Sequence, residues 1–306
     1  MHRVLIAGYG SIGARHGRLL AEMGADVACV TRNRNCPFPI HADLATAVQA
    51  FTPSHVLIAN ATADHAPTLA ALRATGWRGP VLIEKPLFDQ PVDPGDAAGF
   101  RFSVAYNLRF HPLVAELRRH VGRQHWFSAS FHVGQYLPDW RPGTDYRLAY
   151  SASRARGGGV LRDLTHEIDL AVLFCGGMRR IAALGGQISD LEIDSDDVFH
   201  LLGQAERCPV VSIELNYLNR TPRRVLCLNG PGRTVVLDFI AGTLDIDGQR
   251  IEAKPERDVT YIAQLEAFLG GSRAGELCTL AEGMAVDAIV DAADRAARES
   301  VWVTIA

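Results

Sequence analysis

The chain has 306 residues, more than the roughly 100–200 of a typical domain, so two domains are expected. With 48% hydrophobic and 21% charged residues, it has the composition of an ordinary globular protein. A net charge of −3 offers no attraction to nucleic acid or an anionic membrane, and no apolar run approaches the length of a membrane span. We therefore expect neither nucleic acid nor a membrane as a partner.

The first motif is a glycine loop near the beginning of the chain. A strand expected over 4–7 runs into the segment 8–13 (GYGSIG), and a helix over 14–23 follows. In this order, the first glycine allows a tight turn, the second lets the backbone approach a pyrophosphate, and the third lets the helix pack closely on the strand. The loop and the helix N-terminus therefore predict a bound nicotinamide or flavin dinucleotide. The expected contacts are Gly8, Gly10, Ser11, Ile12 and Gly13.

The second strand, expected over 26–30, ends in Thr31 and Arg32. A carboxylate usually stands there and binds the ribose 2′-hydroxyl of NAD. Because a guanidinium matches phosphate oxygens, this tip favours NADP over NAD, with Thr31 and Arg32 as contacts. The alternative is that Arg32 and Arg34 are solvated loop charges, in which case the sequence does not separate the two cofactors.

Alternation of strands and helices continues to about residue 105. Strands are expected over 55–59, 80–84 and 102–106, and helices over 43–51 and 63–75. This alternation is typical of a parallel, doubly wound α/β sheet. We expect a Rossmann dinucleotide-binding domain over 1–105.

The second half predicts an α+β domain with an open, mostly antiparallel sheet. Over 211–217, Val211, Ile213, Leu215 and Tyr217 alternate with Ser212, Glu214 and Asn216, as in a strand with one buried face. Other strands are expected near 124–133, 223–228 and 233–239, and helices near 111–121, 258–270 and 279–297. We expect a substrate-binding and oligomerisation domain over 106–306.

Lys85 is the first catalytic candidate. It follows the strand at 80–84, at the carboxyl edge where open α/β sheets bind ligands. An ammonium group there can stabilise the alkoxide that forms as a hydride leaves or arrives. The alternative is a lysine that only ends a strand.

The second candidate is His166, in a helix expected after the glycines at 157–159. Asp163, His166 and Asp169 are three residues apart, which places them on neighbouring turns of one helix face. His166 could take a proton from a substrate hydroxyl, and a carboxylate one turn away could orient its ring. The alternative is a surface histidine among acids on a solvated helix.

Neither a metal nor a disulfide is expected. No further His or Cys stands near His166 to complete a metal site. The acidic run of Asp194, Asp196 and Asp197 lacks the glycine and distal glutamate of a calcium loop, so a turn before a strand is expected. The six cysteines are scattered and typical of buried thiols in a reducing cytoplasm. The expected first strand also leaves no place for a signal peptide, so we expect a cytoplasmic protein.

A long polar loop over 135–156 combines aromatic and arginine side chains. Tyr136 and Trp140 offer faces that stack on sugar rings or bases, and Arg141 and Arg147 offer forks for carboxylates or phosphates. Loops of this length are commonly lids or binding loops. The alternative is an exposed arm that holds a neighbouring subunit.

Together, these motifs resemble the Gfo/Idh/MocA oxidoreductases, which include glucose–fructose oxidoreductase and inositol dehydrogenase. The resemblance spans nearly the whole chain. It is based on the glycine loop with His16 three residues on, Glu84-Lys85-Pro86, the triple glycine before Asp163 and His166, and the segment 106–112 (YNLRFHP).

The resemblance implies NAD(P)-linked hydride transfer at a secondary alcohol or ketone of a sugar or related polyol. Lys85 and His166 would be catalytic, with Asp163 helping to bind or orient, and the protein would form a homodimer or homotetramer through the second sheet. The implied cofactor contacts are Asn60, Thr62, His65, Glu84, Lys85 and Pro86. The substrate candidates are Asn107, Arg109, Tyr136, Trp140, Arg141, Arg147, Asp163 and His166.

Two departures from the family pattern matter. The segment 60–65 (NATADH) replaces the usual Thr-Pro-Asn ahead of a histidine, and Asp163 precedes His166 by three residues where four is common, so Asp169 becomes a rival partner. The segments 136–142 (YLPDWRP) and 165–169 (THEID) are similar to a subgroup tied to bacterial surface-sugar biosynthesis. We therefore expect an anionic sugar or amino-sugar substrate.

Two other functions remain open from the sequence. A non-catalytic NAD(P)-binding regulator could share the fold, but it would be expected to lack Lys85 or His166, and both are present. An enzyme that oxidises its substrate only transiently, for epimerisation or elimination, would keep the same residues.

Overall fold

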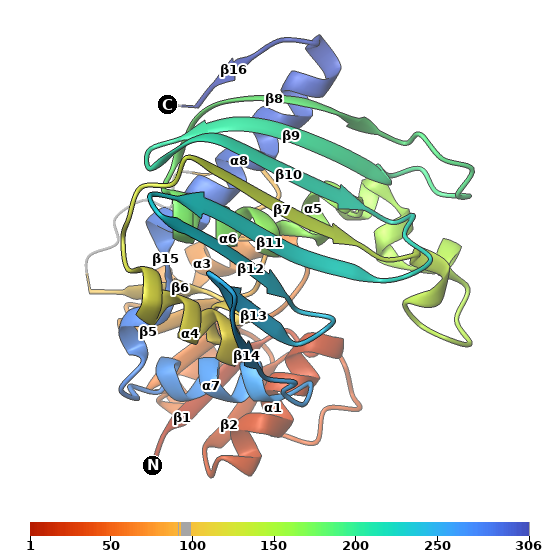
Figure 1. Ribbon diagram of the computed structural model, residues 1–306. Helices are drawn as coiled ribbons and strands as arrows, with labels where there is room; N and C mark the ends of the chain where they lie inside the picture. Colours follow the sequence, from red (N-terminus) through yellow and green to blue (C-terminus); the bar gives the residue numbers. More distant parts are fainter. Residues whose placement is uncertain (91, 93–98, 306) are drawn as a thin grey trace. The chain divides into compact units, whose positions relative to one another are not determined.

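The computed structural model describes residues 1–90, 92 and 99–305 (Figure 1). The chain divides into two units, the first formed by Met1–Phe110 with Arg257–Gly283 and the second by His111–Glu256 with Met284–Ala306. The first unit holds a parallel-dominated sheet and the second a mostly antiparallel one. The expected fold class is therefore confirmed.

The first unit is built on a sheet with the order β15-β6-β5-β4-β1-β2-β3. All neighbouring strands pair in parallel except β15 and β6. The strand order reverses beside β1, so the carboxyl ends of β1 and β4 form the topological switch point, which is where such sheets bind ligands. The strands are β1 (Arg3–Ala7), β2 (Asp26–Val30), β3 (Ile40–His41), β4 (His55–Ile58), β5 (Pro80–Ile83), β6 (Arg101–Val104) and β15 (Cys278–Thr279).

Helices cover both faces of this sheet. As a result, β4 and nearly all of β1 are buried on both faces. Val4 and Ile6 of β1 share a core with residues of α1 and with Leu265 and Phe268 of α7. The helices of this unit are α1 (Ser11–Glu22), α2 (Leu44–Phe51), α3 (His65–Ala74) and α7 (Val259–Phe268).

The observed division differs from the domain boundary expected at residue 105. The first unit continues to Phe110, and the helix expected over 258–270 belongs to it. Two polar contacts account for this: Asn107 donates to Thr260 Oγ1 at 2.7 Å, and Arg109 pairs with Glu282 at 2.8 Å. The segment Arg257–Gly283, late in the chain, therefore completes the first unit.

The second unit holds a nine-stranded sheet with the order β14-β13-β12-β11-β7-β10-β9-β8-β16. Neighbouring strands are antiparallel except β7 and β10, which pair in parallel. The strands are β7 (Ser128–Gly134), β8 (Met178–Gly186), β9 (Val198–Ala205), β10 (Cys208–Asn216), β11 (Arg223–Gly230), β12 (Arg233–Asp238), β13 (Thr243–Ile246), β14 (Gln249–Glu252) and β16 (Val303–Thr304).

One face of this sheet is covered and the other is open. In β10, the apolar residues at 211, 213 and 215 are buried and Ser212 is exposed, as the alternation predicts. Asn216 is an exception: it is buried because its side-chain oxygen accepts from the backbone of Leu218 and Asn219. Helix α6 (Thr165–Cys175) packs on β7 and β10, and α5 (Val160–Asp163) packs on β9 and β10. The remaining helices of this unit are α4 (Pro112–Val121) and most of α8 (Leu280–Glu299).

The helix expected after the triple glycine is two helices. Leu164, with φ −102° and ψ 34°, separates α5 from α6, so Asp163 ends one helix and His166 lies in the next. Spacing by three residues therefore does not place Asp163 and His166 on one continuous helix face. Among the described residues, no helix combines the length and apolar character that crossing a membrane requires.

Candidate functional site

The glycine loop follows β1 in the first unit. A Cβ at Gly8 would lie 2.4 Å from the Asn60 backbone nitrogen, and one at Gly13 would lie 2.3 Å from the Gly8 carbonyl oxygen. Gly10 differs, since a Cβ there would meet nothing within 4 Å among the described residues. Helix α1 starts directly after Gly10 with no side-chain cap, so its first N–H groups can receive an anion. These residues fit the pyrophosphate of a dinucleotide.

The tip of β2 is tied to this loop by Asn33. Its side chain donates to the Tyr9 carbonyl at 2.9 Å, and its backbone N–H donates to Thr31 Oγ1 at 3.1 Å. The Thr31 hydroxyl thus shapes the turn, and Arg32 is exposed beside it. The turn that carries the exposed Arg32 is therefore held beside the glycine loop.

The segment after β4 lies at the same edge of the sheet. Asn60 donates from Nδ2 to Thr68 Oγ1 at 2.7 Å, and Thr62 begins a short 3₁₀ turn over Thr62–Asp64. His65 is 1% exposed, and burial lowers the pKa of its imidazole. Its Nδ1 lies 3.0 Å from the Leu87 carbonyl, so the neutral ring donates there. His65 therefore supports the segment that follows Lys85.

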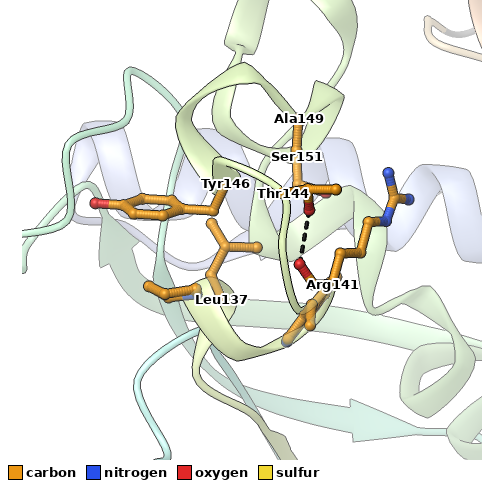
Figure 2. Close-up of a pocket in the computed structure, with 8 residues that line it drawn as sticks. Leu137, Arg141, Thr144, Tyr146, Ala149 and Ser151 are labelled. Atoms are coloured by element: carbon orange, nitrogen blue, oxygen red, sulfur yellow. Dashed lines mark hydrogen bonds between the residues drawn. The ribbon is translucent and has the colours of Figure 1, made fainter.

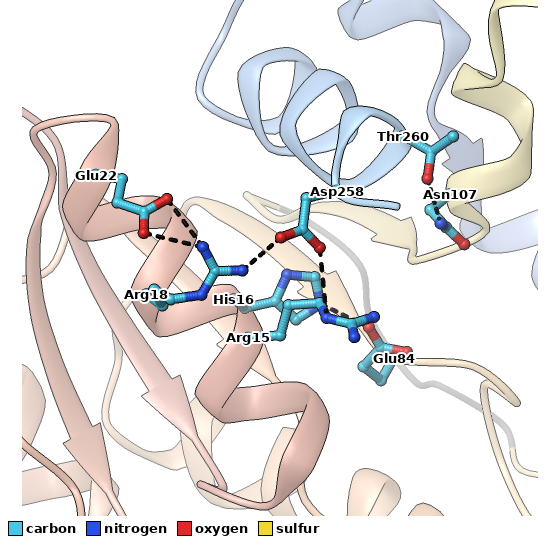
Figure 3. A network of polar contacts seen from close by, with 8 residues as sticks. All are labelled: Arg15, His16, Arg18, Glu22, Glu84, Asn107, Asp258 and Thr260. Carbon is cyan, nitrogen blue, oxygen red and sulfur yellow. Dashed lines mark hydrogen bonds and ion pairs between the residues drawn. The ribbon is translucent and has the colours of Figure 1, made fainter. Parts of the chain in front are cut away.

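Glu84 and Lys85 follow β5. The Glu84 backbone N–H donates to the Ile58 carbonyl at 2.9 Å, which continues the pairing of β5 with β4. One carboxylate oxygen of Glu84 lies 2.7 Å from His16 Nε2 (Figure 3). The other accepts from the Lys85 backbone N–H at 3.2 Å. Lys85 and Pro86 thus start from the sheet edge that also holds Gly8 and Asn60.

Two predicted substrate residues are buried inside the first unit. Asn107 is 6% exposed and bonds to Thr260, as Figure 3 shows, and Arg109 is 2% exposed and pairs with Glu282. The Arg109 guanidinium is thus buried against a carboxylate of the same unit. The structure therefore places Asn107 and Arg109 in the attachment of α7 and the start of α8.

In the second unit, Asp163 receives two phenol hydroxyls. Tyr150 donates to Oδ1, and Tyr217 donates to Oδ2 at 2.6 Å. Burial, together with the Asp163 charge, raises the pKa of both phenols well above the usual tyrosine value. Both tyrosines therefore stay protonated and donate to a carboxylate that is only 6% exposed. The sequence analysis did not assign Tyr150 or Tyr217 to the site; a buried tyrosine needs a partner for its hydroxyl, which is the signal that could have pointed to Tyr217.

His166 and Asp169 lie one turn apart on α6. Asp169 is fully buried, and His166 is half-buried. Between them, Glu167 pairs with Arg224 of β11 at 2.6 Å. The helix is thereby fixed to the sheet, and His166 stands near its N-terminal end.

The loop over 135–156 folds into short 3₁₀ turns around a small hollow (Figure 2). Its cavity volume is about 10 Å³, room for one water molecule at most, so it is too small for a sugar. Trp140 donates to the Gln135 carbonyl at 3.2 Å and packs edge-on against Tyr217, with ring centroids 5.1 Å apart. The residues that line the hollow are Leu137, Pro138, Trp140, Arg141, Thr144, Tyr146, Ala149 and Ser151.

Arg141 and Arg147, the two candidates of this loop for binding an anion, differ in their partners. Arg147 is already engaged by Asp145 at 2.9 Å and Glu192 at 2.8 Å. The Arg220 guanidinium lies 4.1 Å from the centre of the Tyr136 ring. Arg141 lines the hollow, and its side chain is exposed. The Arg147 guanidinium, with two carboxylate partners, is therefore less available to an anionic ligand than an exposed arginine.

The acidic run shapes turns, as expected. Asp194 accepts from the Arg154 backbone at 2.7 Å, and Asp196 accepts from the Leu161 backbone at 2.8 Å. Asp197 accepts from two backbone N–H groups and directly precedes β9. Within the described part of the chain, no cluster of His, Cys, Asp or Glu is arranged to hold a metal ion.

No protein-family model matches this chain, and no curated protein does. Levoglucosan dehydrogenase in complex with NADH matches with a TM-score of 0.83 at 19% identity, over 100% of this chain and 99% of that one. The WlbA dehydrogenase from Bordetella pertussis, in complex with NADH and UDP-GlcNAcA, matches with a TM-score of 0.78 at 17% identity, over 99% and 98%.

UDP-N-acetylglucosamine 3-dehydrogenase from Acidithiobacillus ferrooxidans matches with a TM-score of 0.76 at 19% identity, over 97% of this chain and 98% of that one. These solved structures share the fold of this chain along nearly its whole length. The fold implied by the resemblance to the Gfo/Idh/MocA oxidoreductases is thus the one observed.

Proposed function

We propose that this chain is an NAD(P)-dependent oxidoreductase of the Gfo/Idh/MocA type. It would transfer a hydride between the nicotinamide and a secondary alcohol or ketone of a sugar or amino-sugar derivative. One observation supports this most strongly: Gly8, Asn60 and Lys85 follow the three adjacent parallel strands β1, β4 and β5 at one sheet edge. A dinucleotide site and a cation for the reacting oxygen are therefore neighbours.

The proteins that share the fold support the cofactor and the substrate class. Levoglucosan dehydrogenase and the WlbA dehydrogenase were solved with NADH, and the latter also with UDP-GlcNAcA. For this chain we propose NADP or NAD, with NADP favoured by the Thr31-Arg32 tip. The proposed cofactor contacts are the glycine loop, Thr31, Arg32, Asn60, Thr62 and the segment 84–86. His65 supports the last of these through its hydrogen bond to the Leu87 carbonyl.

When bound, the nicotinamide accepts or donates the hydride. In the oxidation direction, His166 takes the proton of the substrate hydroxyl, and the hydride leaves the carbon that bears this hydroxyl. The Lys85 ammonium donates to the reacting oxygen and stabilises its developing negative charge. The products are the ketone, the reduced cofactor and a protonated His166, which returns its proton in the reduction direction.

Asp163 would help to bind the substrate or orient His166. Its carboxylate keeps a fixed position because the two phenols hold both of its oxygens. Asp169, one helical turn from His166, is the other candidate partner. For an anionic substrate we propose Arg141, with the Trp140 or Tyr136 ring against the sugar.

Replacement of Lys85 by Met tests this function. Turnover should fall by about 100-fold or more, because removing one group that stabilises an oxyanion costs that much. NADH binding, followed by fluorescence, should stay within about threefold, since Lys85 acts chiefly in the transition state. Assays would follow NAD(P)H with levoglucosan, UDP-N-acetylglucosamine and its uronic acid. Lys254→Met, at the chain's other lysine, is the matched control; near-normal turnover in Lys85→Met would refute the mechanism.

We also propose that the protein is a cytoplasmic homodimer or homotetramer that associates through the open face of the second sheet. Leu184 and Leu202 are 74% and 47% exposed on that face, and exposed apolar patches mark association sites. Sedimentation at micromolar concentration should show an oligomer, and Leu202→Glu should weaken it. A monomeric unmodified protein would contradict this assembly.

A further inference from the structure

A buried polar pair connects the helix of the glycine loop to the segment that carries Lys85. His16 lies on α1 and is fully buried, and Glu84 is 8% exposed. Their side chains approach to 2.7 Å, between His16 Nε2 and Glu84 Oε1 (Figure 3). Sixty-eight residues separate the two in sequence, so the contact joins two different parts of the cofactor edge.

The direction of this hydrogen bond follows from burial. His16 Nδ1 has no hydrogen-bond partner among the residues that the structure describes. A proton on Nδ1 would bury an unsatisfied N–H group, which is costly. A proton on Nε2 instead points at the carboxylate, to which it donates. Glu84 thus sets the tautomer and orientation of His16.

The same carboxylate also holds the backbone of the proposed catalytic lysine. Glu84 Oε2 accepts from the Lys85 backbone N–H at 3.2 Å. On the other side of Lys85, the Leu87 carbonyl accepts from His65 Nδ1 at 3.0 Å. Lys85 therefore lies between two anchored points, and one of them leads directly to α1.

We propose that His16 and Glu84 are positioning residues that set the Lys85 backbone relative to the glycine loop, and so relative to the cofactor. This inference rests on the proposed oxidoreductase function. A buried polar pair adds little net stability, because apolar residues of similar volume often replace it without loss. Its contribution is geometric, and a displacement of about 1 Å at a reacting group can cost about 100-fold in rate.

The decisive variant is His16→Leu combined with Glu84→Met, which fills the space without the polar bridge. We expect a melting temperature within a few degrees of the unmodified protein. Because Glu84 is also a proposed cofactor contact, kcat is measured at saturating cofactor. We expect kcat to fall by about 10- to 100-fold, with a much smaller change in KM. A folded double variant that keeps kcat within threefold overturns the proposal.

Two single variants separate positioning from packing. The side-chain amide of His16→Gln can still donate to Glu84, so it should keep kcat at least threefold above that of His16→Leu. Equal kcat in these two variants counts against the proposal. Arg18→Ala is the matched control, because Arg18 lies on the same helix and pairs with Asp258 but does not touch the lysine segment; it should leave kcat unchanged.

Hydrogen exchange of the peptide over 84–87 gives a readout that needs no substrate. The Lys85 N–H donates to Glu84 in the unmodified protein, so its exchange should accelerate at least tenfold in Glu84→Met. Unchanged exchange overturns the positioning role. If no sugar is oxidised or reduced, the proposed function fails, and this measurement still decides whether the pair holds Lys85.

Discussion

Tyr217 donates a 2.6 Å hydrogen bond to Asp163, although 54 residues separate them in sequence. Tyr217 directly follows β10 and is fully buried, and Asp163 ends α5. The bond therefore joins the sheet of the second unit to the short helix that precedes α6. Tyr150 donates to the other oxygen of the same carboxylate. Any role of Asp163 in catalysis depends on this arrangement.

Tyr217→Phe tests the importance of this bond. Loss of the hydroxyl leaves a buried carboxylate with one donor fewer, so the free energy of unfolding should fall by about 1–3 kcal/mol. Urea unfolding measures the change. Tyr146→Phe is the control, because its hydroxyl accepts from the Glu192 backbone N–H at 3.2 Å at the exposed surface. A Tyr217→Phe protein as stable as the control would show that Asp163 does not need this donor.

Gly10 and Gly13 should respond differently to alanine. Gly10 has φ −83° and open space beside it, so Gly10→Ala should fold with unfolding free energy changed by less than about 0.5 kcal/mol. Its Cβ should obstruct the pyrophosphate and weaken NADH binding about tenfold or more. Gly13→Ala places a Cβ against the Gly8 carbonyl and should destabilise the protein by about 1–3 kcal/mol. Unchanged NADH affinity in Gly10→Ala would contradict the proposal that the dinucleotide binds at this loop.

Arg32→Ala tests the preference for NADP. Removal of a charge-assisted contact to the 2′-phosphate should cost NADPH about 1.5–3 kcal/mol of binding free energy and leave NADH nearly unaffected. Fluorescence titration with both cofactors measures the difference. Equal losses for NADPH and NADH, or a preference of the unmodified protein for NADH, would rule out this role.

Arg141 and Arg147 should differ in their effect on an anionic substrate. Arg141→Ala should raise KM for UDP-linked uronic acids by about tenfold or more and change kcat less, because a charge-assisted hydrogen bond is lost. Arg147→Ala should change KM little, since Asp145 and Glu192 already occupy its guanidinium. Initial rates with neutral and charged sugars provide the comparison. Equal KM values for both kinds of sugar in the unmodified protein would contradict an anionic substrate.

His111 should make stability depend on pH. Burial, with a smaller contribution from Arg224, lowers the pKa of His111 to about 4, from 6.5. As the pH falls below 6.5, the unfolded chain takes up a proton that the folded chain does not, so the free energy of unfolding decreases. His111→Asn should flatten this decrease between pH 6.5 and 4 and keep the cap of α4, where His111 Nδ1 accepts from Leu113. Urea unfolding at several pH values measures the slope, and an unchanged slope would contradict the assignment.

The sequence by itself determined many of the individual strands and helices, the glycine loop and the buried face of β10. The order of strand, glycine loop and helix over 4–23 predicted β1 and α1, because this motif is specified by residues that are close together in sequence. Alternation over 211–217 predicted the buried face of β10, because side chains in a strand point to opposite faces in turn. The position of Lys85 at a strand's carboxyl end was also readable. Periodicity and turn chemistry report burial and backbone shape, and these are local properties.

Only the tertiary structure decided which distant residues meet. Thr260 bonds to Asn107 across 153 residues, which attaches α7 to the first unit. The buried Arg109 side chain forms an ion pair with Glu282, across a similarly long stretch of sequence. The helix break at Leu164 and the bonds from Tyr150 and Tyr217 decide the environment of Asp163. No periodic pattern encodes such pairs, because they depend on how whole elements pack and on the need of each buried polar group for a partner.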